Sequence, residues 1–162
     1  MNKQISFFLS LVSVFLSSNL YASDFKLANK YIERYSVFDV EALSDFYSDD
    51  AVFKDLTTEG FKKPFLLEGK KEILKKFSTS FFQNRFTLKY TATEKFESSD
   101  HHIFISEVVA RTKKDDSVSY SCGKVVSIVK IANGKVVSHI DYADYDAFNK
   151  SSKNTNNTCS KF

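Results

Sequence analysis

The spacing of the apolar residues changes once along this chain of 162 residues, from a helical period to the period of a strand. In three segments between Asp24 and about residue 81, apolar residues recur three or four positions apart, which is typical of helices that bury one face. From Phe86 to Phe96 they alternate with polar residues, which is typical of a strand with one buried face. Helices followed by a run of strands predict an α+β domain.

Three helices are expected before this change. The first ends near Val37, and the second begins after Asp39, because aspartate is a favourable N-cap residue. Gly69 precedes the third helix, whose apolar stripe includes Phe77. A strand over residues 51–57 is expected between the second and third helices.

The later part of the chain predicts four long strands, at residues 86–96, 102–112, 117–131 and 135–147. Asn133-Gly134 joins the last two, and Asn-Gly is a strong signal for a tight β-hairpin. Both faces of these last strands carry apolar residues, which predicts helices on one face and another subunit on the other. We expect a strongly curved antiparallel sheet that is capped by three N-terminal helices, a cone-shaped roll with a hollow mouth.

The first 22 residues have the pattern of a signal peptide. Lys3 precedes an apolar run from Ile5 to Leu16, and Leu20-Tyr21-Ala22 is a suitable cleavage site. The run is shorter than the roughly 20 apolar residues of a membrane span. The alternative, an uncleaved anchor, fits poorly with the polar stretch Ser17-Ser18-Asn19. We therefore expect a periplasmic or secreted protein without a stable membrane anchor after cleavage.

One domain, residues 23–149, and a disordered polar tail, residues 150–162, are expected after the signal peptide. Residues 1–22 hold one lysine and no acidic residue, so their removal changes the formal net charge from +3 to +2. The lysines are scattered, and we expect no nucleic-acid partner. Cys122 and Cys159 are the two cysteines; an exported protein could join them, but their positions in the sequence do not show whether they are close.

The histidines and cysteines do not form a metal-binding pattern. There is no Cys-x-x-Cys and no His/Cys cluster with the spacing of zinc ligands, so no metal site is expected. His101 and His102 follow Ser98-Ser99-Asp100, and we expect them at the surface, in a turn. His139 is on the last predicted strand.

Two stretches of the chain match a known pattern. Residues 30–55 end in Ala51-Val52-Phe53-Lys54-Asp55, and residues 133–142 form the predicted closing hairpin. Together they resemble the nuclear transport factor 2-like superfamily, in particular its SnoaL-like domains and ketosteroid isomerases. The resemblance implies a cone fold around a small-molecule pocket and chemistry without a cofactor. Because the architecture hosts isomerases, hydrolases, dehydratases, cyclases and non-catalytic binding modules, it does not fix the function.

The resemblance also assigns roles to single residues. Tyr31 matches the tyrosine that stabilises an oxyanion in the isomerases, and Asp55 matches their catalytic aspartate. The position of their second, protonated aspartate falls on Ser127, or on the neighbouring Val126. Asp141 stands where related epoxide hydrolases and polyketide cyclases carry a catalytic aspartate. The Arg-x-Asp pair of the epoxide hydrolases is not reproduced, because the corresponding residues read Arg-Thr-Lys.

Each of these residues also has a purely structural interpretation. Asp55 follows apolar residues, and desolvation makes a carboxylate more basic, yet an aspartate there can simply end a strand and hydrogen-bond the turn. His139 and Asp141 are two positions apart on one strand, so their side chains leave the same face. His139 could tune Asp141 or move a proton, or the two could be a satisfied polar pair. Tyr31 could be a core tyrosine.

We expect the pocket to be lined by Ser127, Phe53 and Phe77, and three hypotheses follow. The first is an exported domain that binds a small hydrophobic or carbonyl-containing molecule and transfers protons on it, as an isomerase or lyase does, with Asp55 or Asp141 as the base and Tyr31 as the oxyanion donor. The second is a non-catalytic ligand-binding module of the cell envelope. The third is an interaction module that forms a homodimer through the sheet. The sequence leaves open whether the protein is an enzyme.

Overall fold

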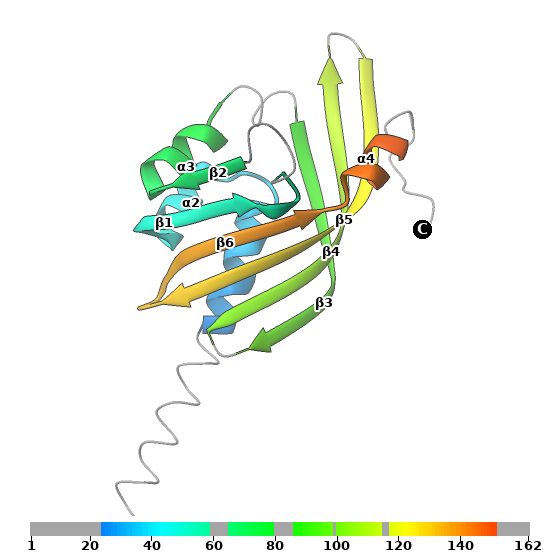
Figure 1. Cartoon of the computed structure of the whole chain (residues 1–162). Coiled ribbons are helices and arrows are strands. Elements are labelled where there is room, and N and C mark those ends of the chain that lie inside the picture. The colour runs from blue at the N-terminus through cyan, green and yellow to red at the C-terminus, as the bar shows by residue number, and fades with distance from the viewer. Residues whose placement is uncertain (1–23, 59–64, 80–85, 99, 115–116, 152–162) are drawn as a thin grey trace, which may run out of the picture.

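The computed structural model of the chain is an α+β domain built on one sheet (Figure 1). The structure describes residues 24–58, 65–79, 86–98, 100–114 and 117–151. Its six strands lie in the order β2-β1-β6-β5-β4-β3. They are β1 Tyr47–Asp55, β2 Phe65–Glu68, β3 Phe86–Ser98, β4 His101–Lys114, β5 Ser117–Ala132 and β6 Lys135–Ala143.

Strands β3 to β6 form the expected antiparallel meander. The Asn133-Gly134 turn joins β5 to β6, and both of its residues have positive φ, 53° and 69°, as a tight hairpin of this kind requires. β6 then lies beside β1 in parallel, because the hairpin turns the chain back into the direction of β1. β2 is an additional edge strand, antiparallel to β1, that the sequence did not predict.

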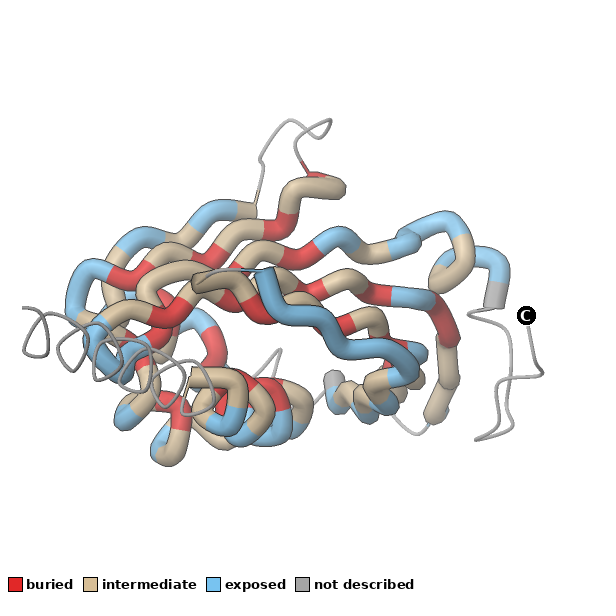
Figure 2. The backbone as a smooth tube through the Cα atoms, turned by 90° about the horizontal axis from the view of Figure 1, so that it is seen from below, coloured by how far each residue is buried: buried red, intermediate tan, exposed pale blue. Residues whose placement is uncertain are grey.

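The helices pack on one face of the sheet, as expected (Figure 2). The first helix covers residues 24–35, and α2 (Val40–Phe46) follows with the side chain of Asp39 as its N-cap, accepting a hydrogen bond from the Ala42 backbone N at 3.2 Å. Gly69, with φ of 86°, directly precedes α3 (Lys70–Phe77). No helix in the described part of the chain is long and apolar enough to cross a membrane.

The end of the domain differs from the expectation. The last strand stops at Ala143 rather than at residue 147, and α4 (Tyr145–Ser151) follows. Asp144 is the reason, because its side chain accepts a hydrogen bond from the Ala147 backbone N at 2.9 Å and so caps a helix. The helix therefore runs past the predicted domain boundary at residue 149. The first strand also starts earlier than expected, at Tyr47.

Buried and less buried positions alternate along the strands, as Figure 2 shows. The prediction that His102 lies in a surface turn is wrong. β4 begins at His101, so His102 is already in the strand, and its side chain points into the core, where it is 1% exposed and packs against the ring of Phe25. The side chain of His101 is 43% exposed.

Two of the predicted features lie largely outside the described residues. The predicted signal peptide, residues 1–22, and the tail from residue 152 onward, including Cys159, belong to this part of the chain. Cys122, on β5, is buried and disulfide-bonded.

Candidate functional site

The concave side of the sheet encloses a cavity of about 420 Å³. The first helix, α3, α4 and all six strands contribute to its wall. Eight of its seventeen lining residues are aromatic, and two are carboxylates. The lining residues are Tyr35, Phe38, Phe53, Asp55, Thr58, Phe65, Phe77, Leu88, Tyr90, Val108, Ala110, Ser121, Val125, Asp141, Ala143, Tyr145 and Phe148.

The two carboxylates of the wall belong to neighbouring strands. Asp55 ends β1, and Asp141 is its direct partner in the parallel pairing of β1 with β6. Partners in a sheet lie on adjacent strands about 4.8 Å apart, and their side chains leave the same face. Both side chains face the cavity, and both residues are buried, at 7% and 4% exposure. The pairing of the strands thus places two acidic groups side by side in an otherwise apolar wall.

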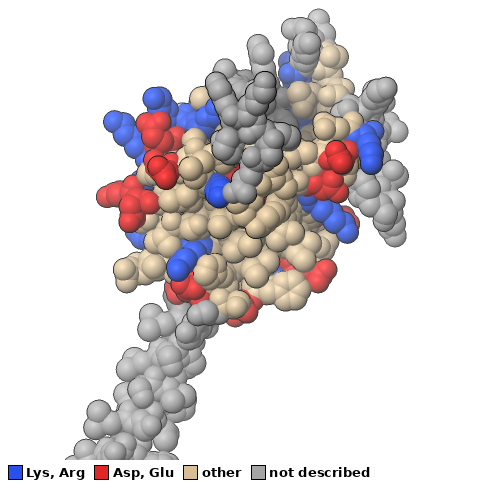
Figure 3. All heavy atoms as spheres, in the orientation of Figure 1, with Lys and Arg blue, Asp and Glu red and all other residues tan. Residues whose placement is uncertain are grey.

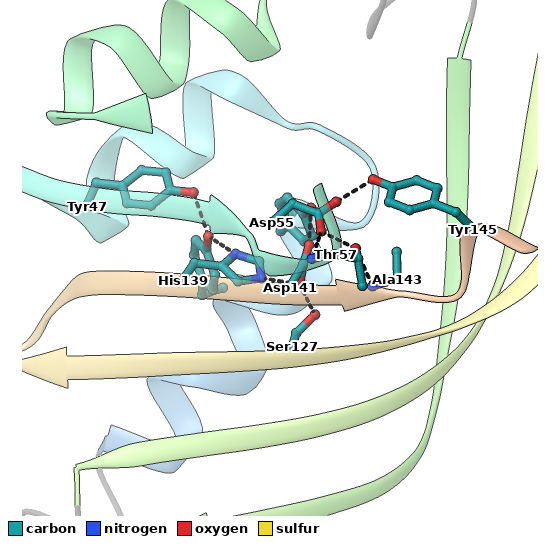
Figure 4. Close-up of polar contacts among 10 residues, drawn as sticks. Tyr47, Asp55, Thr57, Ser127, His139, Asp141, Ala143 and Tyr145 are labelled. Atoms are coloured by element: carbon teal, nitrogen blue, oxygen red, sulfur yellow. Dashed lines mark hydrogen bonds and ion pairs between the residues drawn. The ribbon is translucent and has the colours of Figure 1, made fainter. Parts of the chain in front are cut away.

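Asp141 is held by three hydrogen bonds. Its Oδ1 accepts one from Ser127 Oγ at 2.6 Å and one from His139 Nε2 at 2.8 Å (Figure 4). Its Oδ2 accepts one from the Tyr35 hydroxyl at 2.8 Å. Burial alone would raise the pKa of Asp141, but the charge of His139 and these hydrogen bonds outweigh it and hold the pKa below its usual value. Asp141 is therefore an ionised carboxylate at neutral pH.

A buried hydrogen-bonded chain continues behind Asp141. His139 Nδ1 lies 2.7 Å from the hydroxyl of Tyr31, which lies 2.5 Å from the hydroxyl of Tyr47. Burial, and then the neighbouring Tyr47, raise the pKa of Tyr31 well above its ordinary value, so this phenol keeps its proton. Since both ring nitrogens of His139 are engaged, the ring can move a proton only between Tyr31 and Asp141.

Asp55 is held in a different way. Its Oδ1 accepts hydrogen bonds from the backbone N of Thr57, at 3.0 Å, and from the Thr57 hydroxyl, while its Oδ2 accepts one from the hydroxyl of Tyr145. Asp55 thus ends the strand and secures the turn η1 (Leu56–Thr58), as the structural interpretation of the sequence expected, and it also faces the cavity. Burial, and then the hydrogen bond to Asp55, raise the pKa of Tyr145, which stays a donor.

The residues singled out in the sequence fall into two groups. Asp55, Asp141, Phe53 and Phe77 line the cavity. Tyr31, His139 and Ser127 are not among the lining residues and lie behind Asp141, each at most 1% exposed. Ser127, which we expected in the pocket wall, instead donates its hydroxyl proton to Asp141.

Three tyrosines of the wall were missed: Tyr35, Tyr90 and Tyr145. Tyr35 lies one helical turn after Tyr31, so the helical stripe contained it but gave no reason to prefer it. Tyr90 is on the alternating strand β3, on the face that the alternation predicts to be buried. Tyr145 had no signal, because the sequence was assigned to a strand there.

The wall carries negative charge without a basic side chain. Among the described residues that line the cavity there is no lysine, arginine or histidine. In the same part of the chain, no group of three or more His, Cys, Asp or Glu residues could hold a metal ion. What the site offers is therefore two carboxylates and several protonated phenols in an apolar space, a combination suited to proton transfer or to the binding of a polar group on an apolar molecule.

Residues 28–139 match the family model of the SnoaL-like domain. The chain belongs to the SnoaL-like domain family. This SnoaL-like chain has the cone fold of the nuclear transport factor 2-like superfamily, as the resemblance implied. No curated protein matches it at a significant level.

Solved structures with a similar fold include proteins of different kinds. A candidate SnoaL-like polyketide cyclase from Shewanella putrefaciens CN-32 is 18% identical, with a TM-score of 0.68 over 79% of this chain and 94% of that one. A LEH-like epoxide hydrolase from M. tuberculosis is 12% identical, with a TM-score of 0.64 over 82% and 90%. A candidate isomerase from Bacillus subtilis is 18% identical, with a TM-score of 0.60 over 83% and 98%. At these identities the likeness is one of fold.

Proposed function

We propose that this SnoaL-like domain binds a small hydrophobic, carbonyl-containing molecule in its cavity and transfers a proton on it without a cofactor. The observation that carries the proposal is the pair formed by Asp141 and Tyr35 at the cavity wall, a carboxylate that accepts a hydrogen bond from a protonated phenol. Burial, and then the charge of Asp141, raise the pKa of Tyr35 well above its ordinary value. The pair therefore offers a base and a donor in one apolar space.

The pair supports a specific sequence of events. When a carbonyl oxygen reaches the hydroxyl of Tyr35, the phenol turns its hydrogen bond from Asp141 Oδ2 to that oxygen. Asp141 then loses one of the three hydrogen bonds that hold its pKa down, and it becomes a stronger base. Asp141 takes a proton from the carbon next to the carbonyl, and Tyr35 stabilises the enolate oxygen that forms. In an isomerase Asp141 then returns the proton to another carbon of the same molecule. In a lyase the proton instead assists the loss of a leaving group. His139 tunes Asp141 from behind.

A deuterium-exchange assay tests this proposal. The protein is incubated in D₂O with hydrophobic ketones, β-hydroxy ketones and a 3-oxo-Δ5-steroid, and label at the carbon next to the carbonyl is followed by NMR. We expect exchange with the natural protein and a loss of about 10²–10⁴-fold in Asp141→Asn. Tyr35→Phe should also slow exchange, whereas Asp100→Asn, which changes a surface carboxylate, should not. No exchange with any carbonyl compound, or equal rates in Asp141→Asn and Asp55→Asn, would contradict the proposal.

A non-catalytic binding module is the second candidate, and one observation favours it. The three hydrogen bonds that lower the pKa of Asp141 also weaken it as a base in the empty site. In this case the polar groups only orient a lipid-like guest. Native mass spectrometry of protein purified gently from its own host would then show a retained small molecule that the protein does not convert.

Export to the periplasm or the cell exterior is part of the same proposal. It rests on the sequence of residues 1–22, and the disulfide of Cys122 is consistent with it, since disulfides persist in oxidising compartments. Fractionation of cells that produce the chain with and without residues 1–22 tests it. Retention of the complete chain in the cytoplasm would argue against export.

The outer face of the sheet supports a homodimer. Register places Phe96, Ile103, Ile128 and Ile140 in one row across four strands. Phe96 is 47% exposed, and the three isoleucines are partly exposed. None of the helices that the structure describes covers this face, and a row of apolar side chains on such a face is typical of an interface.

A further inference from the structure

Asp55 is a buried carboxylate whose partners are all uncharged. The backbone N and the hydroxyl of Thr57 and the phenol of Tyr145 occupy its oxygens. Among the described residues, no lysine, arginine or histidine forms an ion pair with it. Asp141 differs, since His139 lies 2.8 Å from its Oδ1. A buried carboxylate is costly unless a charge of opposite sign lies beside it, and Asp55 has hydrogen-bond donors but no basic side chain as a partner.

The wall around Asp55 is aromatic. Phe53 and Phe65 meet at 90° with their ring centroids 5.8 Å apart, and Phe53 and Phe77 meet at 89° and 5.2 Å, so the rings present faces in several directions. Aromatic faces carry partial negative charge and attract cations. The exposed Lys76 already places its Nζ 5.8 Å from the centroid of the Phe65 ring, although this lysine does not line the cavity.

The size of the cavity sets the remaining requirement. At about 420 Å³ it falls in the range of ligand pockets, and a bare ammonium ion would leave most of it empty. Asp55 and Asp141 are direct partners on adjacent strands, so a guest whose cationic nitrogen contacts Asp55 brings atoms only a few bonds away to Asp141 and Tyr35.

We infer that the guest is a cation, a carbonyl compound that carries a tertiary amine or quaternary ammonium group close to the carbonyl. Asp55 supplies the counter-charge, the rings of Phe53, Phe65 and Tyr145 surround the charged nitrogen, and the carbonyl group lies at Asp141. The inference rests on the proposed function for the second half of this arrangement. The first half, selection of a positive charge, depends only on Asp55 and the aromatic wall.

Two probes of the same shape test the inference. One is (4-acetylphenyl)trimethylammonium, and the other is 4-tert-butylacetophenone, in which carbon replaces the charged nitrogen. Dissociation constants are measured by tyrosine fluorescence or ligand-observed NMR at physiological salt. We expect the cation to bind at least tenfold more tightly to the natural protein. In Asp55→Asn this preference should fall to about twofold or less, while the affinity for the neutral probe should change little.

Matched variants serve as controls for the possibility that Asp55→Asn acts by disturbing the fold. Asp100→Asn removes an exposed carboxylate outside the cavity and should leave both affinities unchanged. Phe65→Leu keeps the carboxylate of Asp55 but removes one aromatic ring. It should weaken the binding of the cationic probe more than the binding of the neutral probe. Thermal unfolding of each variant shows whether the fold is retained.

The outcomes separate the inference from the proposed function. If the neutral probe binds as tightly as the cation, or if the preference for the cation survives in Asp55→Asn, the inference is wrong while binding of hydrophobic carbonyl compounds stands. If neither probe binds, both are wrong.

Discussion

The negative charge of Asp141 depends mainly on neighbouring side chains, because only a small part of the residue is exposed in the cavity. Asp141 is 4% exposed, and Ser127, His139 and Tyr35 take the place of solvent. A group whose pKa is lowered in the folded state adds stability above its unfolded pKa and loses that contribution as pH falls through the folded pKa. For an aspartate the unfolded value is about 4, so this stabilisation is fully present at neutral pH, begins to decline near pH 4, and is lost as the pH falls through the lower folded pKa of Asp141.

Ser127→Ala tests this dependence. The substitution removes one hydrogen bond to a charged acceptor, which contributes about 1.5–3 kcal/mol, and the pKa of Asp141 rises. We expect the free energy of unfolding to fall by about that amount at pH 7. The difference in the free energy of unfolding between the variant and the natural protein should become smaller below about pH 4, as Asp141 becomes protonated. Urea unfolding at both pH values measures it. Ser138→Ala, on the same sheet, should have a small effect at either pH; a loss at Ser127 that is independent of pH would contradict the prediction.

Single residues were predictable where a local pattern or a resemblance marked them. Asp55 and Asp141 were found in this way, and both reach the cavity. Their direct pairing was not predictable, because it depends on the parallel contact between β1 and β6, which are far apart in the sequence. Tyr31 and Tyr35 share one helical stripe, and only the packed position of the helix decides which of them reaches the cavity. The buried position of His102 was missed because successive side chains of a strand face opposite sides of the sheet, so an error of one residue exchanges a surface position for a core position.

At the scale of elements, α4 closes the cavity on the side of β5. Phe148 packs so closely on Gly123 that a Cβ at this glycine would lie 2.5 Å from the ring, and Tyr145 ties the start of the helix to Asp55. The long strands and the first three helices were predictable from periodicity. β2 and α4 were not, because β2 is only four residues long and the alternation of β6 continues into the sequence of α4.

Gly123→Ala is predicted to move α4. The added methyl group must displace the Phe148 ring, and since the helix is short and lies at the end of the described chain, the fold should survive. We expect faster amide exchange in α4 and a loss of guest affinity of about tenfold, or about 1.4 kcal/mol. Hydrogen exchange and the binding assay above measure the two effects.

A double-mutant cycle provides the control for this prediction. If displacement of Phe148 is the cause, Gly123→Ala should have no further effect in a Phe148→Ala background. Equal effects of Gly123→Ala in both backgrounds would mean that α4 does not close the cavity through this contact.

At the scale of the whole molecule, the two faces of the sheet have different roles. The inner face carries the cavity, and no helix from the described residues lies on the outer face. Figure 3 shows mostly uncharged side chains over the middle of this outer face, with lysines, arginines and acidic residues gathered toward its rim. Val126 and Tyr142 are paired across β5 and β6 beside the row that contains Ile128, and Tyr142 is 43% exposed. An apolar centre with a charged rim is the usual anatomy of a protein interface.

Ile128→Lys should therefore convert a dimer into a monomer. Ile128 is only partly buried and faces away from the cavity, so a lysine there can extend into solvent in the monomer, but in a dimer it would place an unpaired charge in an apolar contact. We expect sedimentation velocity to show a dimer for the natural protein and a monomer for the variant, with unchanged circular dichroism. Glu33→Lys, an exposed charge reversal on the first helix, should leave the dimer intact. Because the cavity lies wholly on the inner face, the monomeric variant should still bind the guest; a natural protein that stays monomeric at high concentration would exclude the dimer.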